Sequence, residues 1–257
     1  MVLKSSEITS QRYHDIFDYK LTKDEAVRWQ YKNQKILVSD IKSRSQLQRK
    51  KYSESKLQIA KRASKLISKV PTVLFVGVTG SLAMMNAEKD SDIDLIIITK
   101  RNTLWTTRML VYGILLAVGY GLRKPDQHNE KDKLCLNMWL DETSLVWDRK
   151  DRNIYTGHEI AQIAPLVNKN KIYEIFLQKN KWILDFWPNA VVVQRDGIAS
   201  WAKYLVHSNN INILEKVAFK LQYLYMKNKI ITEIVTPNKA IFHKNDWGKV
   251  VMGKLTP

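Results

Sequence analysis

The chain has 257 residues, of which 45% are apolar, and its 8 Trp, 11 Tyr and 6 Phe supply bulky core side chains. This composition is that of a packed globular protein and excludes an intrinsically disordered chain. The net charge of +17, from 42 Lys and Arg against 25 Asp and Glu, favours an anionic partner such as a nucleotide, RNA or DNA. The single cysteine, Cys135, cannot form an internal disulfide, which fits a cytoplasmic protein.

Residues 1–69 are expected to form a basic, helical N-terminal unit. Thr22 and Glu25 have the spacing of a capping box, which predicts a helix from Lys23 to about Gln34. Residues 42–69 hold ten Lys or Arg and one Glu, and their apolar residues fit one side of a second helix. This basic helix could bind nucleic acid, or it could present a solvated polar face.

Residues 70–150 alternate between strand and helix patterns. Pro71 ends the basic helix, because proline and the residue before it leave the helical region. Apolar runs then predict strands at Thr72–Val78, Asp92–Thr99 and Leu134–Leu140, and a hairpin strand at Ser144–Trp147. We predict helices over Leu82–Ala87 and Leu104–Leu122. The apolar run from Met109 to Leu122 has 14 residues, whereas a spanning helix needs about 20, so we expect a buried helix and no membrane partner.

Residues 151–257 have a helical pattern almost to the end, with segments near Thr156–Leu166, Ile172–Phe186 and Ile211–Lys227. Taken together, the patterns predict an α+β protein. A small mixed sheet in residues 70–150 would hold the site, between the helical unit of residues 1–69 and a helical domain of residues 151–257.

Four residues between the first two predicted strands carry the chemistry. Gly80 and Ser81 form a strand-to-helix turn, where backbone N–H groups and a hydroxyl can hold phosphate oxygens. Asp92 and Asp94 lie two apart at the start of a strand, so their carboxylates project from one face. Two such anions repel unless a cation lies between them, and Mg²⁺ prefers these oxygen ligands. The arrangement suits nucleotidyl transfer.

The segment VGVTGSLAMMNAEKDSDIDLIIIT resembles the signature of the DNA-polymerase-β-like nucleotidyltransferase superfamily, in which Gly-Ser precedes Asp-x-Asp. The stretches KLCLNMWLDE, RNIYTGHEIAQIAPL and KNKWILDFWPNA also resemble a group of uncharacterised bacterial proteins with this domain. That group often carries a winged-helix-like segment in front, which residues 7–40 would match. The resemblance implies that Gly80 and Ser81 bind the triphosphate and that Asp92 and Asp94 bind Mg²⁺.

The same resemblance implies a third acid on the next strand. Strand alternation places Cys135, Asn137 and Trp139 on one face, and Asn137 is the position that best matches the third acid. Asparagine can bind a metal but cannot take a proton at neutral pH, which puts catalysis in doubt. Asp141 is the alternative, although it lies roughly 13 Å further along the strand. Lys133 shares the face of Asn137 and is a further candidate for nucleotide binding.

These residues lead to two main hypotheses; a third, an enzyme that modifies a small molecule such as an aminoglycoside, is disfavoured by the basic surplus, because such acceptors favour acidic clefts. In the first, the chain is a Mg²⁺-dependent enzyme that transfers a nucleoside monophosphate from an NTP to an acceptor such as RNA. In the second, it is a degenerate nucleotide- or nucleic-acid-binding regulatory module without catalysis. His158 and Glu159 could also be catalytic, but capping or packing explains them more simply.

Overall fold

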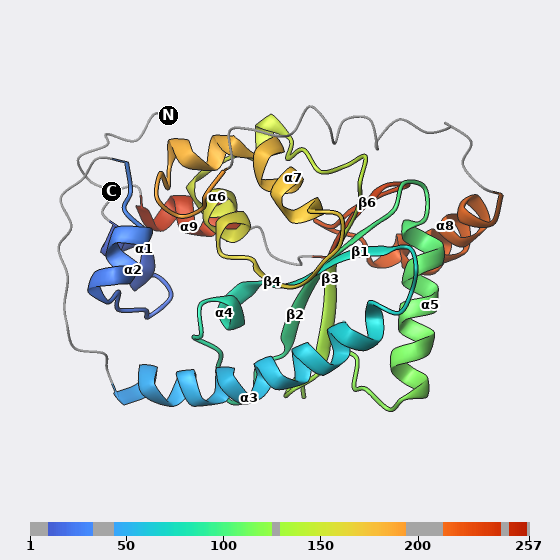
Figure 1. The fold of residues 1–257 in the computed structure, drawn as a ribbon, viewed down its shortest axis with the longest axis horizontal. Helices are drawn as coiled ribbons and strands as arrows, with labels where there is room; N and C mark the ends of the chain where they lie inside the picture. The colour runs from blue at the N-terminus through green and yellow to red at the C-terminus, as the bar shows by residue number, and fades with distance from the viewer. Residues whose placement is uncertain (1–9, 33–43, 125–128, 194–212, 243–246, 256–257) are drawn as a thin grey trace.

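The computed structural model describes residues 10–32, 44–124, 129–193, 213–242 and 247–255, and it is built around one mixed sheet (Figure 1). The sheet has six strands in the order β4-β1-β2-β3-β6-β5. Its strands are β1 (Val73–Val78), β2 (Ile93–Thr99), β3 (Leu134–Asp141), β4 (Ala164–Asn168), β5 (Ile234–Thr236) and β6 (Lys239–Ile241). Strands β2 and β3 pair in parallel and the other neighbours pair antiparallel. The predicted α+β class is confirmed.

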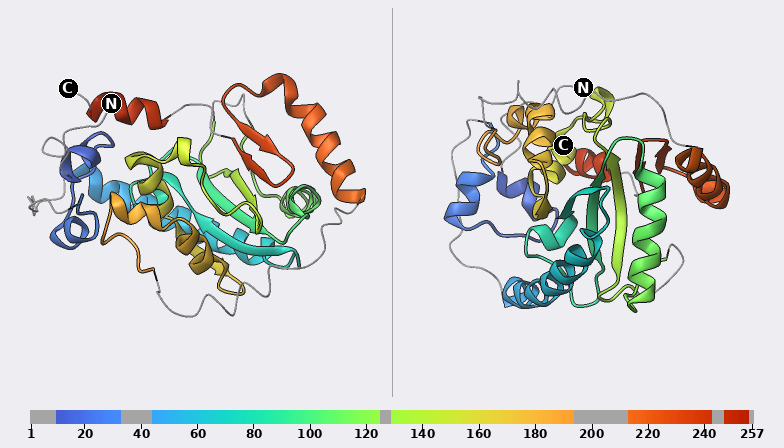
Figure 2. Two further views of the ribbon diagram at one scale, coloured as in Figure 1. Left: turned by 90° about the horizontal axis from the view of Figure 1, so that it is seen from above. Right: turned by 45° about the vertical axis from the view of Figure 1, so that its right-hand side comes forward.

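Helices cover both faces of the sheet (Figures 1 and 2). Alternate residues of the central strands enter different cores, because successive side chains of a strand point to opposite faces. Phe75 and Ile96 pack with one helical layer, and Val76 and Ile97 pack with the other. The first layer contains α1 (Ser10–Asp15), α2 (Lys23–Arg28), α6 (Ile154–Ala161), α7 (Ile172–Lys179) and α9 (Trp247–Leu255). The second contains α3 (Arg44–Ile67), α4 (Gly80–Ala83), α5 (Leu104–Ala117) and α8 (Ile213–Met226).

The predicted capping box of α2 is confirmed. Thr22 Oγ1 accepts from the backbone N–H of Glu25, and the Glu25 carboxylate accepts from the backbone N–H of Thr22. The helix ends at Arg28, earlier than expected, because Trp29 leaves the helical conformation and stacks on the buried ring of His158. Residues 33 and 34 of the predicted helix, and residues 7–9 and 33–40 of the winged-helix-like segment, lie outside the described residues.

Two of the predicted elements in the second half of the chain were wrong. Ser144–Trp147 is not a strand, because the Asn180 side chain takes over its backbone hydrogen bonds: Nδ2 donates to Leu145 O at 2.7 Å and Oδ1 accepts from Trp147 N at 2.9 Å. The predicted helix at Thr156–Leu166 ends at Ala161, and Ala164–Asn168 forms edge strand β4. Pro165 is compatible with an edge strand, where an N–H is not required. The β5–β6 hairpin was not predicted.

Helix α5 corresponds to the long apolar run, but it is buried on one side only. Trp105, Val111 and Leu115 are fully buried, whereas Leu110 and Leu116 are 56% and 60% exposed. Among the described residues, no helix is both long enough and apolar enough to cross a membrane.

Helix α3 contains a buried lysine that ties together the loops leading into β2 and β3. The side chain of Lys56 is 1% exposed, and its Nζ donates to Lys89 O at 3.1 Å, Ser91 O at 2.7 Å and Asp132 Oδ1 at 2.7 Å. Since Ser91 immediately precedes Asp92, this interaction fixes the start of the strand that carries the acids.

We expect Lys56→Met to lower the free energy of unfolding by about 2–4 kcal/mol, because it leaves a partly buried carboxylate and two carbonyl groups without their donor. Urea denaturation followed by tryptophan fluorescence measures the change. Lys61→Met removes an exposed charge from the same helix and should change stability by less than about 0.5 kcal/mol. Equal stabilities of the two variants would contradict this role of Lys56.

Two buried histidines join α1 to α6. His14 Nδ1 donates to Ser10 O at 2.7 Å, so its Nε2 accepts the hydrogen bond of 3.1 Å from His158 Nε2. Burial lowers the pKa of His14 from 6.5 to about 4 and lowers the pKa of His158. His14 is therefore neutral at pH 5, where histidines of the unfolded chain are protonated.

Between pH 6.5 and about 4, His14 is protonated in the unfolded state and neutral in the folded state. Its contribution therefore lowers the free energy of unfolding as pH falls. Asp94 and Glu159, whose pKa values are raised, act in the opposite direction, so wild type must be compared with His14→Gln. The free energy of unfolding of wild type minus that of His14→Gln should fall by about 2 kcal/mol from pH 7 to pH 5. A constant difference in urea denaturation over this range would contradict the assignment.

Candidate functional site

The turn between β1 and α4 lies directly against β2. Thr79 N donates to Asp94 O at 3.0 Å, which ties the turn to the start of β2. Gly80 has φ +61°, a conformation that favours glycine, and a Cβ at this position would lie 2.8 Å from Asp94 Oδ2. Ser81 is exposed and lines the same cavity as Gly80 and Asp94. The predicted phosphate handle and the predicted metal ligand are therefore neighbours.

Asp92, Asp94 and Cys135 form a cluster at this end of the sheet. One ligand atom from each lies within 4.8 Å of the others. The parallel pairing of β2 with β3 places Cys135 opposite Asp94. Burial, and after it the neighbouring charge of Asp92, raise the pKa of Asp94 to about 7. Burial also raises the pKa of the Cys135 thiol, so the two carboxylates are the anionic ligands of the cluster.

The charge of Asp92 is balanced by Arg123, a residue that sequence analysis did not single out. Arg123 Nη1 lies 3.0 Å from Asp92 Oδ2, and Nη2 lies 2.9 Å from Glu130 Oε1. Its backbone N donates to Leu134 O at 2.9 Å, which holds the guanidinium beside the start of β3. A basic residue in a polar loop has no local pattern that would have marked it.

Asn137 lies at the acid cluster and Asp141 does not. Asn137 Nδ2 donates to Asp94 Oδ1 at 2.7 Å. Asp141 pairs in register with Thr99 at the far end of the strand, where its carboxylate accepts from the backbone of Asn102 and Thr143 at 3.1 and 2.8 Å. Asn137 Oδ1 is buried and accepts no hydrogen bond from any described residue, so this oxygen is available to a ligand.

A β-bulge in β3 places Asn137 and Trp139 on different faces of the strand. The pairing with β2 advances three residues on β3, from Cys135 to Met138, against two on β2. The expected alternation therefore fails after Asn137: Leu136 and Trp139, not Asn137 and Trp139, share a core. Bulges redirect side chains and are frequent beside active sites. The prediction that Trp139 lies on the face of Asn137 was wrong for this reason.

Lys133, the other predicted nucleotide-binding residue, points toward its own loop. Its Nζ donates to Asn129 O at 2.6 Å, and Lys133 is not among the residues that line the cavity. Arg108 of α5 does line it, with the guanidinium 4.7 Å from the Tyr112 ring and 5.0 Å from the Phe242 ring.

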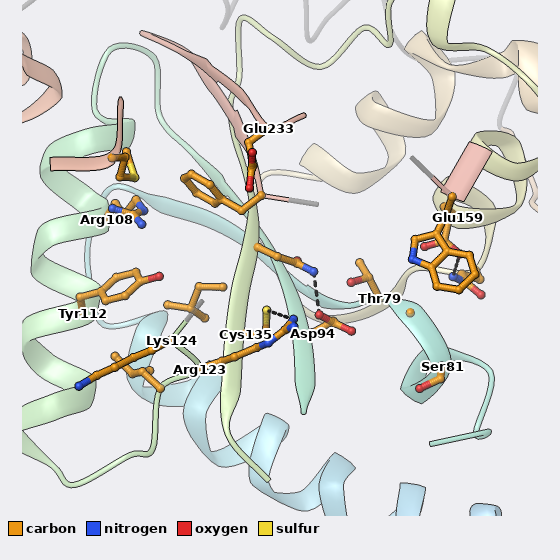
Figure 3. A pocket seen from close by; sticks show the side chains of 18 of the residues that line it. Thr79, Ser81, Asp94, Arg108, Tyr112, Arg123, Lys124, Cys135, Glu159 and Glu233 are labelled. Atoms are coloured by element: carbon orange, nitrogen blue, oxygen red, sulfur yellow. Dashed lines mark hydrogen bonds between the residues drawn. The ribbon is translucent and has the colours of Figure 1, made fainter. Parts of the chain in front are cut away.

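Asp94 opens into a cavity of about 1300 Å³ between two walls. Figure 3 shows Asp94 in the centre, with Thr79, Ser81 and Glu159 on one side and Arg108, Tyr112 and Arg123 on the other. Residues of α8 and of the β5–β6 hairpin region, including Leu221, Gln222, Glu233 and Phe242, complete the second wall. A cavity above the range of about 300–1,000 Å³ that single ligands occupy can hold two substrates side by side.

Glu159 faces this cavity from α6. Its helix buries Ile154, Gly157 and Ile160 against the core, so Tyr155, Glu159 and Gln162 recur at helical spacing along the cavity side. Burial raises the pKa of Glu159 from 4.5 to about 8, and the charge of Asp94 contributes to this rise. Sequence analysis attributed Glu159 to packing, because nothing local connects α6 with β2.

We expect Gly80→Ala to disturb the acids more than the fold. The added methyl group meets the Asp94 carboxylate in a backbone conformation that alanine rarely adopts, so Asp94 must move. Mn²⁺ affinity, measured by electron paramagnetic resonance, should fall about tenfold or more while the circular dichroism spectrum is retained. Gly113→Ala, where a Cβ has open space, is the matched control. Unchanged Mn²⁺ affinity in Gly80→Ala would contradict the contact.

Residues 58–151 match the family model of the nucleotidyltransferase domain. A comparison with curated proteins gave no significant match. The matched segment includes the Gly80–Ser81 turn, both acids of β2 and Asn137, and it ends before α6. Residues 58–151 are therefore similar to a nucleotidyltransferase domain, which is consistent with the resemblance of the Gly80–Ser81 and Asp92–Asp94 motifs to the DNA-polymerase-β-like superfamily.

Proposed function

We propose that this chain is a Mg²⁺-dependent nucleotidyltransferase that transfers a nucleoside monophosphate from an NTP to a hydroxyl or phosphate acceptor and releases pyrophosphate. The observation that carries the proposal is that ligand atoms of Asp92 and Asp94 lie within 4.8 Å of each other, and that Asp94 lines one cavity together with the Gly80–Ser81 turn. The nucleotidyltransferase domain at residues 58–151 supports transfer chemistry of this general kind.

The donor set suits a hard divalent cation. Mg²⁺ prefers oxygen ligands. The cluster offers two carboxylates whose ligand atoms lie within 4.8 Å of each other. Asn137 adds a buried side-chain oxygen that accepts no hydrogen bond from a described residue. When bound, the metal would neutralise phosphate charge and activate the attacking hydroxyl. Asp92 and Asp94 would hold it, and the Nδ2 hydrogen bond of Asn137 keeps the Asp94 carboxylate oriented.

The nucleotide would lie between the two walls of the cavity. Gly80 lets the backbone approach a phosphate closely, and the exposed Ser81 hydroxyl can donate to a phosphate oxygen. Arg123 supplies a fixed positive charge beside the acids: burial lowers the pKa of its guanidinium, but the hydrogen bond to Cys135 and the charges of Asp92 and Glu130 more than offset this. The remaining volume would accommodate the acceptor.

Replacing Asp92 or Asp94 with Asn should abolish Mg²⁺-dependent NTP binding and leave the fold intact, because each change removes one charged metal ligand. Calorimetry with each of the four NTPs, with and without Mg²⁺, measures the loss. Asp90→Asn removes an exposed carboxylate from the same loop and should bind as the wild type does. Unchanged nucleotide affinity in both site variants would rule out this site.

A second candidate function, nucleic-acid binding, is favoured by the surface of α3. Lys50, Lys51, Lys61, Arg62 and Lys65 are all exposed along this helix. No described residue of α3 lines the cavity, so a nucleic acid bound there would be held outside the site. An RNA bound to this helix can serve as the acceptor only if its end reaches the cavity.

If these five residues each neutralise a phosphate, log Kd should change with log salt concentration with a slope of about 4–5 on double-stranded DNA. Reversing Lys61, Arg62 and Lys65 to Glu should weaken binding without changing sequence preference. Fluorescence anisotropy with labelled DNA and RNA, at salt concentrations from about 50 to about 300 mM, tests this prediction. A salt-independent affinity would remove α3 as the binding surface.

A further inference from the structure

Nucleotidyl transfer to a hydroxyl group needs a proton acceptor, and Asn137 cannot serve as one at neutral pH. Among the described residues that line the cavity, three carry a carboxylate: Asp94, Glu159 and Glu233. Asp94 belongs to the metal cluster. Glu233 is held in its own turn, where Oε2 accepts from Ile231 N at 2.7 Å and Thr232 N at 3.0 Å. The search for a base therefore leads to Glu159.

The position of Glu159 is fixed by the packing of α6. Asn153 and Thr156 form a capping box at the start of this helix, and Gly157 lets it approach closely: a Cβ there would lie 3.4 Å from the Trp182 ring. Gln162 Nε2 donates to Glu159 Oε1 at 2.5 Å, which orients the carboxylate and leaves Oε2 without that donor. In Figure 3, Glu159 lies on the same side of Asp94 as Thr79 and Ser81.

We propose that Glu159 is the general base of this nucleotidyltransferase. Its carboxylate takes the proton from the acceptor hydroxyl, the acceptor oxygen forms a bond to the α-phosphorus, and the bond from that phosphorus to the bridging oxygen breaks. The electron pair of the broken bond leaves with pyrophosphate, so protons and charges balance. The assignment rests on the proposed function, and it places the base on a helix outside the matched domain, residues 58–151.

The electrostatic surroundings of Glu159 support this role. The charge of Asp94 on β2 affects its pKa, its own charge affects the pKa of the buried Tyr13 hydroxyl on α1, and Gln162, the residue after α6, donates to it. Burial is the main cause of its raised pKa of about 8, and the charge of Asp94 is the second. Neutralising Asp94 removes the second cause and brings the pKa closer to neutrality, the range in which a general base is most effective.

The test compares wild type with Glu159→Gln, which keeps the oxygen that accepts from Gln162 but cannot take a proton. Pyrophosphate release is measured with Mg²⁺ and each of the four NTPs, with water or total RNA as the acceptor, over pH 6–9. We expect kcat of Glu159→Gln to fall by about 10²- to 10⁴-fold and to lose its rise with pH. Mn²⁺ and NTP affinities should be unchanged, and Glu159→Asp should recover part of the activity.

Two further variants separate this assignment from its alternatives. Glu174→Gln removes an exposed carboxylate outside the cavity and should be as active as wild type. Loss of activity in Glu233→Gln with full activity in Glu159→Gln would overturn the assignment, as would loss of Mn²⁺ binding in Glu159→Gln. A wild type that neither binds NTP with Mg²⁺ nor releases pyrophosphate would instead overturn the proposed function itself.

Discussion

Two carboxylates at the buried start of β2 repel each other, and much of the surrounding structure compensates for that repulsion. Arg123 lies 3.0 Å from Asp92, and Asn137 donates to Asp94 at 2.7 Å. The raised pKa of Asp94 shows that these partners do not fully offset burial and the charge of Asp92. A divalent cation held as proposed would offset the remaining repulsion between the two carboxylates.

The geometry of the cluster depends on the pairing of β2 with β3. The parallel pairing brings Cys135 opposite Asp94, and Asn137, two residues further along β3, donates to the same carboxylate. Lys56 reaches from α3 to the loops that enter both strands, so the two chain segments are held together at the site. A helix that looks like a charged surface in sequence therefore has one face that supports the acids and another that faces solvent.

The cavity is completed by parts of the chain that follow the matched domain. Strand β4 extends the sheet beyond β1, α6 brings Glu159 to one wall, and α8 with the β5–β6 hairpin forms the other. The matched segment supplies the acids, the turn and part of the cavity wall, including Arg108 and Tyr112. Residues before and after it, such as Phe17, Glu159 and Leu221, supply the rest of the lining.

The sequence alone determined the local features: the capping box of Thr22, the strands Val73–Val78 and Ile93–Thr99, and the neighbouring positions of Gly80 and Asp94. Each depends on residues close together in the chain. Only the tertiary structure decided the bulge between Cys135 and Met138, the pairing of β6 with β3, the ion pair of Arg123 with Asp92 and the position of Glu159 on the cavity wall. These depend on which distant segments pack together, and hydrophobic periodicity specifies which face of a helix or strand is buried but not the partner that covers it.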